Sequence, residues 1–491
     1  MNLSGSIDID VSTGKYISKY NPQRTIDQFI KKIITERNIN SKSIILIIGA
    51  IGVFFQNSLS KIGFDRSRIV ICYLSKKHGT APEASSWVFG NNMPFSTFLL
   101  NSISLKDITN LEIIEWLPVK KDFTKEVEHV HSHIKIFSEK IRSNIHTFGI
   151  MGKHWLKNFI RNYLSIDEFY NISSINGTVV LVVPGPSLVQ SLEIIRKYRS
   201  NVCIAALSSA VFPLINADIT PDLILQTDGG YWAERLLDYI DLKNTFIVKT
   251  FTSAISTPAK IVPLLNACPL EDFLTVSIKQ DIPSIPDQGT VTVTALSYLS
   301  QIATDDIYVC GLDLENNIDS AHTNGHLQYF LWINSQFRTS SFFTKGIDNT
   351  LCRAEPNQHG NFSDRGLIQY AQVLSHIKLN PLQHVYRVCP SSINLPFQPK
   401  SIQDLEDDIK IPHPYLLRTR CSNNDFQSKK QFLDNLSNLQ STATIKSNIE
   451  EFILWAKTET YLKKTNIDID LFNDICKPFL SLGNELLQSQ Y

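Results

Sequence analysis

Apolar runs separated by turn-forming residues recur along the chain at the spacing expected for alternating strands and helices. The clearest series begins at Thr178 with the strand-like run TVVLVV, the turn PGPSL and the helical pattern VQSLEIIRKYR. It continues with the strand-like run NVCIAAL, a short helical run and the strand-like run ITPDLILQTD, which ends at Asp228. Alternation of strands and helices at this pace predicts a parallel sheet.

Three later apolar runs are predicted to extend this sheet, because they have the length and composition of buried strands. They occupy residues 245–248, 273–276 and 306–310, and residues 291–302 have the pattern of a helix before the last of them. We expect this domain to end near Pro399.

The N-terminal region shows a second pattern of strand, turn and helix. Residues 43–62 pass from a β-branched run through Gly49 and Gly52 into helical spacing, and a further strand-like run follows at 69–73. The unit is of Rossmann type, but its G-A-I-G turn lacks the full G-x-G-x-x-G pattern, and no Asp or Glu ends the second strand. A scaffold role is therefore favoured over a site for NAD.

Helical spacing dominates two further regions. Residues 121–170 carry apolar positions on one helical face and are predicted to form a helical linker. Beyond residue 400, apolar positions recur at helical spacing with no strand-like alternation. These positions are Phe432, Leu436, Leu439, Ile445, Ile449 and Phe452. The predicted fold class is therefore α/β, with a smaller Rossmann-like N-terminal domain (1–120), the linker, a Rossmann-like central domain with a parallel sheet (171–400) and a C-terminal helical region (401–491).

Composition and charge exclude several classes of protein. The 491 residues include 47 Lys and Arg against 47 Asp and Glu, so no overall field attracts nucleic acid or an anionic membrane. The longest apolar run, residues 44–55, is shorter than the ~20 residues of a membrane helix, and the chain starts without the apolar core of a signal peptide. The eight cysteines are scattered without a C-x-x-C pair, as is typical of reduced thiols. We therefore expect a cytoplasmic protein that binds neither nucleic acid nor membrane.

The turn after the first central strand is the leading candidate for an anion site. A strand that ends in small residues and opens a helix directs backbone N–H groups and the positive helix end at one point. In this turn Gly185 allows close approach, Pro186 suits the first helical position and Ser187 offers a hydroxyl group. A plain connection between strand and helix, without a ligand, is the alternative.

Small and polar residues at other strand ends are expected to face the same crevice, because ligands of open parallel sheets bind beyond the carboxyl ends of the strands. Ser208 follows the second central strand, and Asp228 after the third is placed to accept hydrogen bonds from hydroxyl groups. Gly289 and Thr290 precede the predicted helix at 291–302 and offer a second set of helix N-terminal N–H groups. For this pair a simple helix cap is the alternative.

A polar loop after the strand at 306–310 contains the candidate base. The loop carries Asp313, a candidate substrate-binding residue, and then His322 and His326. A histidine in such a loop can take a proton from an attacking hydroxyl group near neutral pH. A surface histidine without a catalytic role has the same sequence signature.

A pair of histidines on a predicted helix raises the question of a metal site. His129 and His133 stand four residues apart and could share an ion. No Cys and no second group of ligands lies nearby in the sequence, so a solvated helix face is favoured and no metal site is predicted.

Taken together, these segments resemble the motility accessory factor (Maf) glycosyltransferases, which have an MptE-like central domain. The similarity is carried by VVLVVPGPSL, ALSSAVFPL, TPDLILQTD, QGTVTVTAL, IYVCGLDL and AHTNGH, in the order of the family. It spans residues 177–326 and is looser on either side. The resemblance implies an enzyme that attaches a nonulosonic acid, of the pseudaminic or legionaminic type, to serine or threonine of flagellin and is needed for filament assembly and motility.

The same central domain is similar to bacterial CMP-sialic-acid-dependent sialyltransferases, which use a histidine base and no metal. This resemblance implies an inverting transfer from a CMP-activated donor substrate, with no further cofactor. It gives the role of base to His322, with His326 in reserve. The other implied positions are Gly185 and Ser187 at the nucleotide phosphate, Ser208 and Asp228 at nucleotide or sugar hydroxyl groups, and Gly289 and Thr290 at the donor sugar.

Two other functions are compatible with these residues. A related branch resembles 6-hydroxymethylpterin pyrophosphokinases, in which the crevice would hold ATP and a pterin. Phosphoryl transfer needs ligands for Mg²⁺, and Asp228 with Asp313 is a small supply. A non-catalytic flagellin-binding factor is the third hypothesis, suggested by the long helical C-terminal region.

Overall fold

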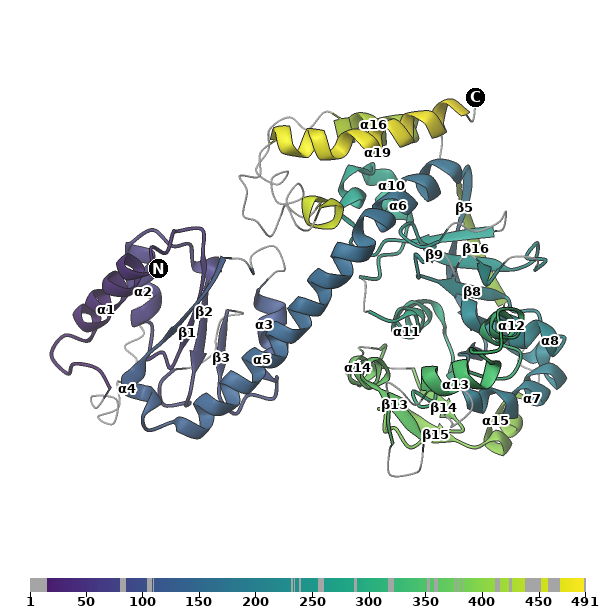
Figure 1. The fold of residues 1–491 in the computed structure, drawn as a ribbon, viewed down its shortest axis with the longest axis horizontal. Helices are drawn as coiled ribbons and strands as arrows, with labels where there is room; N and C mark the ends of the chain where they lie inside the picture. The colour runs from purple at the N-terminus through teal and green to yellow at the C-terminus, as the bar shows by residue number, and fades with distance from the viewer. Residues whose placement is uncertain are drawn as a thin grey trace. The chain divides into compact units, whose positions relative to one another are not determined.

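The computed structural model of the chain describes residues 16–489 with gaps. The gaps are residues 80–84, 104–107, 109, 231–232, 234, 238–239, 255–259, 287–288, 317–321, 351–353, 357–360, 376, 378, 382, 411–415, 424–425, 438–451 and 458–468. The chain packs into two compact units, which are described separately (Figure 1). Unit 1 comprises residues 1–150 and 453–467, and unit 2 comprises residues 151–452 and 468–491.

Unit 1 is built around a four-stranded parallel sheet in the order β3-β2-β1-β4. Its strands are β1 (Ile44–Ile48), β2 (Ile69–Tyr73), β3 (Ser86–Val88) and β4 (Leu111–Glu115). Its helices are α1 (Pro22–Glu36), α2 (Phe54–Lys61), η2 (Arg66–Arg68), α3 (Phe95–Ser102), α4 (Leu117–Lys120) and α5 (Thr124–Thr147). Every residue of β1 and β2 is buried, which explains their unbroken apolar runs. The predicted N-terminal series of strand, turn, helix and strand is confirmed.

Unit 2 is built around an eight-stranded parallel sheet in the order β10-β9-β8-β7-β6-β11-β14-β15. Its strands are β6 (Val179–Val182), β7 (Cys203–Leu207), β8 (Leu223–Gln226), β9 (Phe246–Thr250), β10 (Lys260–Leu264), β11 (Ile307–Cys310), β14 (Val385–Val388) and β15 (Gln398–Lys400). The chain moves from β6 outward to β10 and then returns to place β11 on the other side of β6. The α/β fold class with two parallel sheets is therefore confirmed.

Helices and short helical turns accompany this sheet, and both of its faces are covered by apolar clusters. The helices are α6 (Lys153–Ser165), η5 (Pro186–Gln190), α7 (Leu192–Lys197), η6 (Arg199–Asn201), η7 (Ser208–Ala210), α8 (Val211–Asn216), η8 (Pro269–Phe273), α10 (Val276–Asp281), α11 (Val291–Ile302), α12 (Leu327–Asn334), α13 (Phe342–Thr350), α14 (Arg365–Leu374), α15 (Ile402–Ile409), α16 (Phe426–Ser437) and α19 (Ile469–Ser489), with η4 (Phe148–Gly152) between α5 and α6. Along β6, Val179 and Leu181 belong to one cluster, whereas Val180 and Val182 belong to the other. The predicted helix at 291–302 is confirmed as α11.

The prediction of a strand at residues 273–276 is wrong. Pro269–Phe273 is the 3₁₀ helix η8, and α10 follows it. Leu270 and Phe273 are buried three residues apart, a helical spacing that a short apolar run does not reveal. Three strands of this sheet were not predicted: β10, β14 and β15. Pro263 in β10 argues against an inner strand, and β10 indeed lies at the edge of the sheet.

The apolar pattern does not predict two antiparallel pairs of strands. One pair joins β5 (Glu168–Asn176), after α6, to β16 (Leu416–Asn423). The other pair, β12 (Ala354–Pro356) and β13 (Phe362–Asp364), is a short ribbon in the polar region before α14. The C-terminal region is otherwise helical as predicted, in α16 and α19, and part of its predicted apolar pattern lies outside the described residues. The outlying positions are Leu439, Ile445 and Ile449.

Two expectations from composition can be compared with the described part of the chain. The six cysteines whose side chains are described are free thiols, and five of them are buried. None of the described helices combines the length and the apolar character that crossing a bilayer requires.

Candidate functional site

The candidate site lies where the strand order reverses, outside the carboxyl ends of β6 and β11. The turns after these neighbouring strands contain Gly185 and Gly311. The amide of Gly185 donates a hydrogen bond to the carbonyl oxygen of Gly311 (2.9 Å), so the two turns are in direct contact. A Cβ atom on Gly185 would collide with that carbonyl group and with the carboxylate of Asp313. Because ligands of open parallel sheets bind at such a reversal, we take the region of these two turns as the candidate site.

The carboxylate of Asp313 occupies the position at which an anion was expected. The backbone amide of Ser187 donates a hydrogen bond to its Oδ2 atom (2.9 Å). The Leu188 amide donates to the Gly185 carbonyl oxygen (3.1 Å), and the two prolines of the turn have no N–H group. The backbone donors of residues 184–188 are thus all used within the chain. A phosphate group at this turn has to replace the carboxylate of Asp313.

The environment of Asp313 makes its carboxyl group easy to neutralise. Burial raises its pKa, while the Ser187 amide and the Arg387 guanidinium group oppose that rise. Arg387 is itself buried and donates hydrogen bonds to the carbonyl oxygens of Leu312 (2.8 Å) and Asp313 (3.2 Å), which fixes this loop. A carboxyl group with a raised pKa gains a proton more readily when a second anion approaches.

The loop with the two candidate histidines lies against the same turn. The Thr323 amide donates a hydrogen bond to the carbonyl oxygen of Pro184 (2.8 Å). The rings of His322 and His326 stack with their centroids 4.1 Å apart. The hydroxyl group of Tyr329 accepts from the His322 amide (3.0 Å) and donates to the His322 carbonyl oxygen (2.8 Å). The structure therefore brings the predicted base to the predicted turn.

Burial keeps both histidines uncharged at neutral pH. It lowers the pKa of His322 to about 4, and burial together with the neighbouring His322 lowers the pKa of His326 to about 3. Nδ1 of His326 accepts a hydrogen bond from the Gln328 amide (3.2 Å), which assigns the ring proton to Nε2. His326 therefore has no free nitrogen to accept a proton, and His322 is the better candidate for a base.

Three buried polar atoms of this region have no hydrogen-bond partner within the described chain. They are Ser187 Oγ, Thr323 Oγ1 and His326 Nε2. Buried polar atoms in folded proteins are almost always paired, because leaving one unpaired costs about 1–3 kcal/mol. Ser187 lies in the turn after β6, and the loop of Thr323 and His326 is hydrogen-bonded to the same turn. Three unpaired polar atoms in such neighbouring segments are typical of a binding site for a polar ligand.

The other four predicted residues occupy separate positions in unit 2. Ser208 follows β7 in η7 and is buried, and Asp228 follows β8 and is exposed. Gly289 has a φ angle of 77°, and Thr290 is the N-cap residue of α11 without a side-chain cap. The contacts described above link the other five predicted residues, which lie in the β6 turn and in the loop after β11. The four residues of this paragraph take no part in those contacts and share only the sheet with them.

Sequence reasoning missed the residues of α6 that hold the loops after β8 and β9. Asn158 donates hydrogen bonds to the carbonyl oxygens of Gly229 (3.1 Å) and Thr252 (3.2 Å). Asn162 donates to two carbonyl oxygens of the loop after β9 (both 2.8 Å). A signal was present, because two asparagines stand four residues apart on a helix face that is otherwise apolar. These bonds fix the loop that carries Asp228.

The histidine pair of unit 1 is engaged in helix packing. The rings of His129 and His133 lie 4.4 Å apart on α5, and Nδ1 of His133 is 3.0 Å from the hydroxyl oxygen of Ser96 on α3. Over the described ranges, no three His, Cys, Asp or Glu side chains gather into a group that could hold a metal ion.

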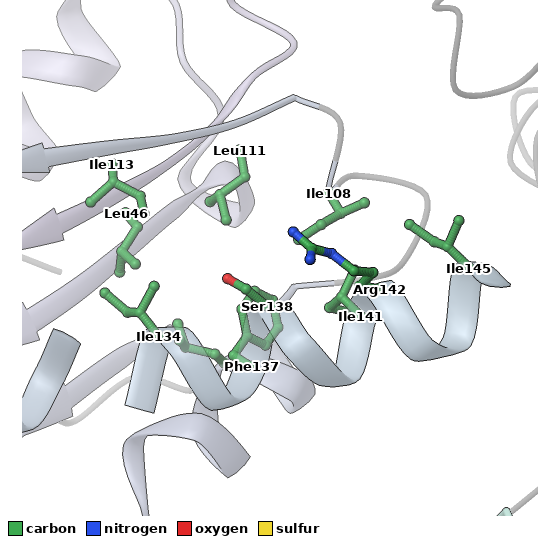
Figure 2. A pocket seen from close by; sticks show the side chains of 11 residues that line it. Leu46, Ile108, Leu111, Ile113, Ile134, Phe137, Ser138, Ile141, Arg142 and Ile145 are labelled. Atoms are coloured by element: carbon green, nitrogen blue, oxygen red, sulfur yellow. The ribbon is translucent and has the colours of Figure 1, made fainter. Parts of the chain in front are cut away.

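A half-open apolar hollow of about 430 Å³ lies in unit 1 (Figure 2). It is lined by β4 side chains, including Leu111 and Ile113, and by α5 side chains, including Phe137. Its polar groups are Ser138 and Arg142, and they provide no nucleophile with an adjacent base. The candidate site is therefore the polar region at the β6 and β11 turns of unit 2, and not this apolar hollow.

Comparison with known proteins relates the middle of the chain to one family. The family model described as 6-hydroxymethylpterin diphosphokinase MptE-like matches residues 153–319, which is less than half of the chain. An uncharacterized protein of Treponema pallidum (strain Nichols) is 27% identical over 296 residues, or 60% of this chain and 63% of that protein. The chain thus spans less than two thirds of the length of this curated relative.

One solved structure has a backbone that follows a similar path over most of the chain. It is the MAf glycosyltransferase from Magnetospirillum magneticum AMB-1, which matches 95% of this chain and 78% of its own at 12% identity, with a TM-score of 0.49. The similarity at this level supports no statement about activity, so the function is argued from the site.

Proposed function

We propose that this protein is a glycosyltransferase of the Maf type, which moves a pseudaminic or legionaminic acid from a CMP-activated donor to serine or threonine of flagellin. The observation that supports the proposal is the set of unpaired buried polar atoms beside an uncharged histidine at the reversal of the strand order. The match of residues 153–319 to the MptE-like family covers the β6 turn and the first part of the loop after β11, including Asp313, and ends before His322.

In the proposed reaction, the acceptor oxygen attacks the anomeric carbon of the donor sugar. The bond from this carbon to the phosphate oxygen of CMP breaks, the electron pair leaves with CMP, and the configuration inverts. His322 accepts the proton of the acceptor hydroxyl group. Since burial lowers the pKa of His322 to about 4, the imidazole is unprotonated and able to accept at neutral pH.

The phosphate of the donor is proposed to lie at the Gly185 turn. There it takes the hydrogen bond that the Ser187 amide now donates to Asp313. Because burial already raises the pKa of Asp313, the approach of a phosphate, which raises it further, favours the protonated form of this carboxyl group. A protonated Asp313 donates a hydrogen bond to the phosphate instead of repelling it.

The remaining predicted residues have supporting roles in this proposal. Ser208 and Asp228 bind hydroxyl groups of the nucleotide or the sugar, and Gly289 and Thr290 bind the donor sugar. The reaction as written needs no metal ion and no further cofactor. We place it in the cytoplasm, before filament assembly, so that loss of the protein would impair motility.

The test is sugar transfer by the purified full chain. CMP-pseudaminic acid and CMP-legionaminic acid are each offered with unglycosylated flagellin, and the intact mass of the flagellin shows whether a sugar has been added. A mass increase that needs both the chain and one donor supports the proposal. No transfer from either donor, together with no affinity for CMP in calorimetry, would contradict it.

The name of the matched family favours a second candidate, a 6-hydroxymethylpterin diphosphokinase. In that function the β6 turn would face the phosphates of ATP. The hydroxymethyl oxygen of the pterin would attack the β-phosphorus, the bond to the α-phosphate oxygen would break, and AMP would leave. Asp228 and Asp313 would be the candidates for binding Mg²⁺. Calorimetry with ATP, Mg²⁺ and 6-hydroxymethylpterin, beside CMP alone, separates the two: heat from the pterin set and none from CMP selects the kinase.

A further inference from the structure

Helix α12 is rich in apolar residues, yet none of its side chains is buried. Its sequence is LQYFLWIN, and it begins directly after His326, which is its N-cap residue. An amphipathic helix of a globular protein normally buries its apolar face. An apolar helix that stays at the surface next to a candidate base is therefore a feature that the fold alone does not explain.

Helices α12 and α13 pack on each other (Figure 1). Both carry exposed apolar side chains. We name as the α12–α13 face the large exposed apolar side chains of the two helices and their connection. These are Phe330, Ile333, Phe337, Phe343 and Ile347. Exposure reaches 64% at Phe337 and 73% at Phe343. Single exposed apolar residues are common, but a group of them on one helix pair indicates an interaction site.

A series of ring contacts connects the α12–α13 face to the candidate base. The ring of His326 stacks on His322 and lies 6.3 Å from the ring of Tyr329. Tyr329 lies 6.0 Å from Phe342, which in turn lies 5.7 Å from the exposed Phe343. Phe343 is thus linked to His322 through the packed rings of Phe342, Tyr329 and His326.

The chemistry of the face distinguishes the two substrates of the proposed reaction. The donor is a charged nucleotide sugar: its phosphate and hydroxyl groups gain nothing from apolar side chains, and its single cytosine ring can stack on one aromatic ring but cannot cover five large side chains. An acceptor polypeptide can bury apolar side chains there. The exposed Arg338, between the two helices, adds a positive charge that suits an acidic residue of the same partner.

We propose that the α12–α13 face docks an apolar segment of the acceptor polypeptide and so delivers a neighbouring serine or threonine hydroxyl group to His322. The inference rests on the proposed glycosyltransferase function and adds the surface by which the acceptor is held. It assigns the polar crevice at Gly185 to the donor and the apolar face to the acceptor.

The test compares two variants of the full chain. Phe337→Ser combined with Phe343→Ser removes the two most exposed members of the face, and substitution of exposed side chains leaves the fold intact. Val276→Ser is the matched control, because this side chain is 71% exposed on α10 of the same unit. The double variant should raise the KM for flagellin roughly tenfold or more, with kcat and the affinity for CMP unchanged. The control should match the wild type.

A binding assay with immobilised flagellin separates this inference from the proposed function. If the wild type binds flagellin but transfers no sugar, the proposed function fails, and loss of binding in the double variant still supports docking. Equal KM and equal binding in the double variant and in Val276→Ser overturn the inference, as does a wild type that binds no flagellin. It is also overturned if the double variant keeps flagellin binding but loses sedimentation with phosphatidylserine vesicles or a dimer in gel filtration.

Discussion

In both parallel sheets of this protein the chain moves outward from one strand and later returns to add a strand on its other side. The two units differ in the side chains that lie at this reversal of the strand order. The reversal lies between β1 and β4 in unit 1 and between β6 and β11 in unit 2. The first strand at each reversal is followed by a turn that contains a glycine. This is Gly49 after β1 in unit 1 and Gly185 after β6 in unit 2. The same arrangement of strands thus offers the same place twice.

In unit 1 apolar side chains fill this place. Trp116, directly after β4, is buried, and its ring centroid lies 4.8 Å from that of Phe29 and 5.7 Å from that of Phe55. A Cβ atom on Gly49 would lie 3.5 Å from both the Trp116 carbonyl oxygen and the Val119 side chain. The turn is therefore closed by packing, as expected of a scaffold.

In unit 2 the corresponding place holds polar groups that packing does not require. The carboxylate of Asp313 lies on the Ser187 amide, and the loop of His322 is fastened to the same turn. Burial of polar groups costs free energy unless they are paired. Topology therefore marks where a site can be, and the side chains at that place decide whether it has chemistry.

His322→Ala should give the largest effect. Loss of a general base lowers the rate of sugar transfer by about 10²–10⁴-fold, while the affinity for CMP persists because the phosphate contacts lie on the turn. The rate is followed as CMP release in the presence of flagellin. His131→Ala is the matched control, since His131 is an exposed histidine of unit 1. If His322→Ala transfers sugar at the wild-type rate, His322 is not the base of the reaction.

Trp116→Ala should have the next largest effect, and on stability alone. Removing a buried indole costs about 3–5 kcal/mol in the free energy of unfolding. The affinity for CMP should not change, because unit 1 acts as a scaffold. Urea unfolding followed by circular dichroism measures the first quantity, and calorimetry measures the second. Leu117→Ala, the exposed neighbour, should stay within about 0.5 kcal/mol of the wild type. Loss of CMP binding in Trp116→Ala would mean that both reversals serve the site.

Alanine at the two turn glycines should act in different ways. Gly49 has a φ angle of +80°, so Gly49→Ala should cost about 1–2 kcal/mol of stability and leave CMP affinity unchanged. Gly185 has a φ angle of −68°, so alanine brings no backbone strain, but its Cβ atom collides with Asp313. We expect Gly185→Ala to weaken CMP binding roughly tenfold, about 1.4 kcal/mol. Equal CMP affinity in both variants would argue against a phosphate site at the unit 2 turn.

The smallest expected effect is a pH dependence of stability in unit 2. Burial lowers the pKa of His322 from 6.5 to about 4, so between these pH values the unfolded chain binds a proton that the folded chain excludes. The free energy of unfolding therefore falls as the pH drops through this window. Relative to His322→Asn, the wild type should lose ~1 kcal/mol between pH 7 and pH 5.5. The opposite contribution of Asp313 is common to both proteins and cancels. A difference that stays constant with pH would show that His322 is not buried as described.

The apolar pattern is sufficient for the inner strands β6, β7 and β8 and for α11, because buried parallel strands have unbroken apolar runs and the helix has its own period. It also locates the Gly185 turn, Asp313 and the two histidines, since polar residues after successive parallel strands converge on one edge. It fails for β10, which contains Pro263, and for β14 and β15, which are short and contain polar residues. It also fails for η8, whose apolar residues have the composition of a strand.

Contacts between segments that are distant in the sequence decide the rest. Local spacing carries no sign of the pairing of β5 with β16, nor of the hydrogen bond from Thr323 to Pro184. The sequence therefore shows which residue types form the candidate site, but not their protonation states or their hydrogen-bond partners. The Asp313 carboxylate meets the Ser187 amide, and His322 loses its charge, only because folding makes β6 and β11 neighbours and removes water from between their loops.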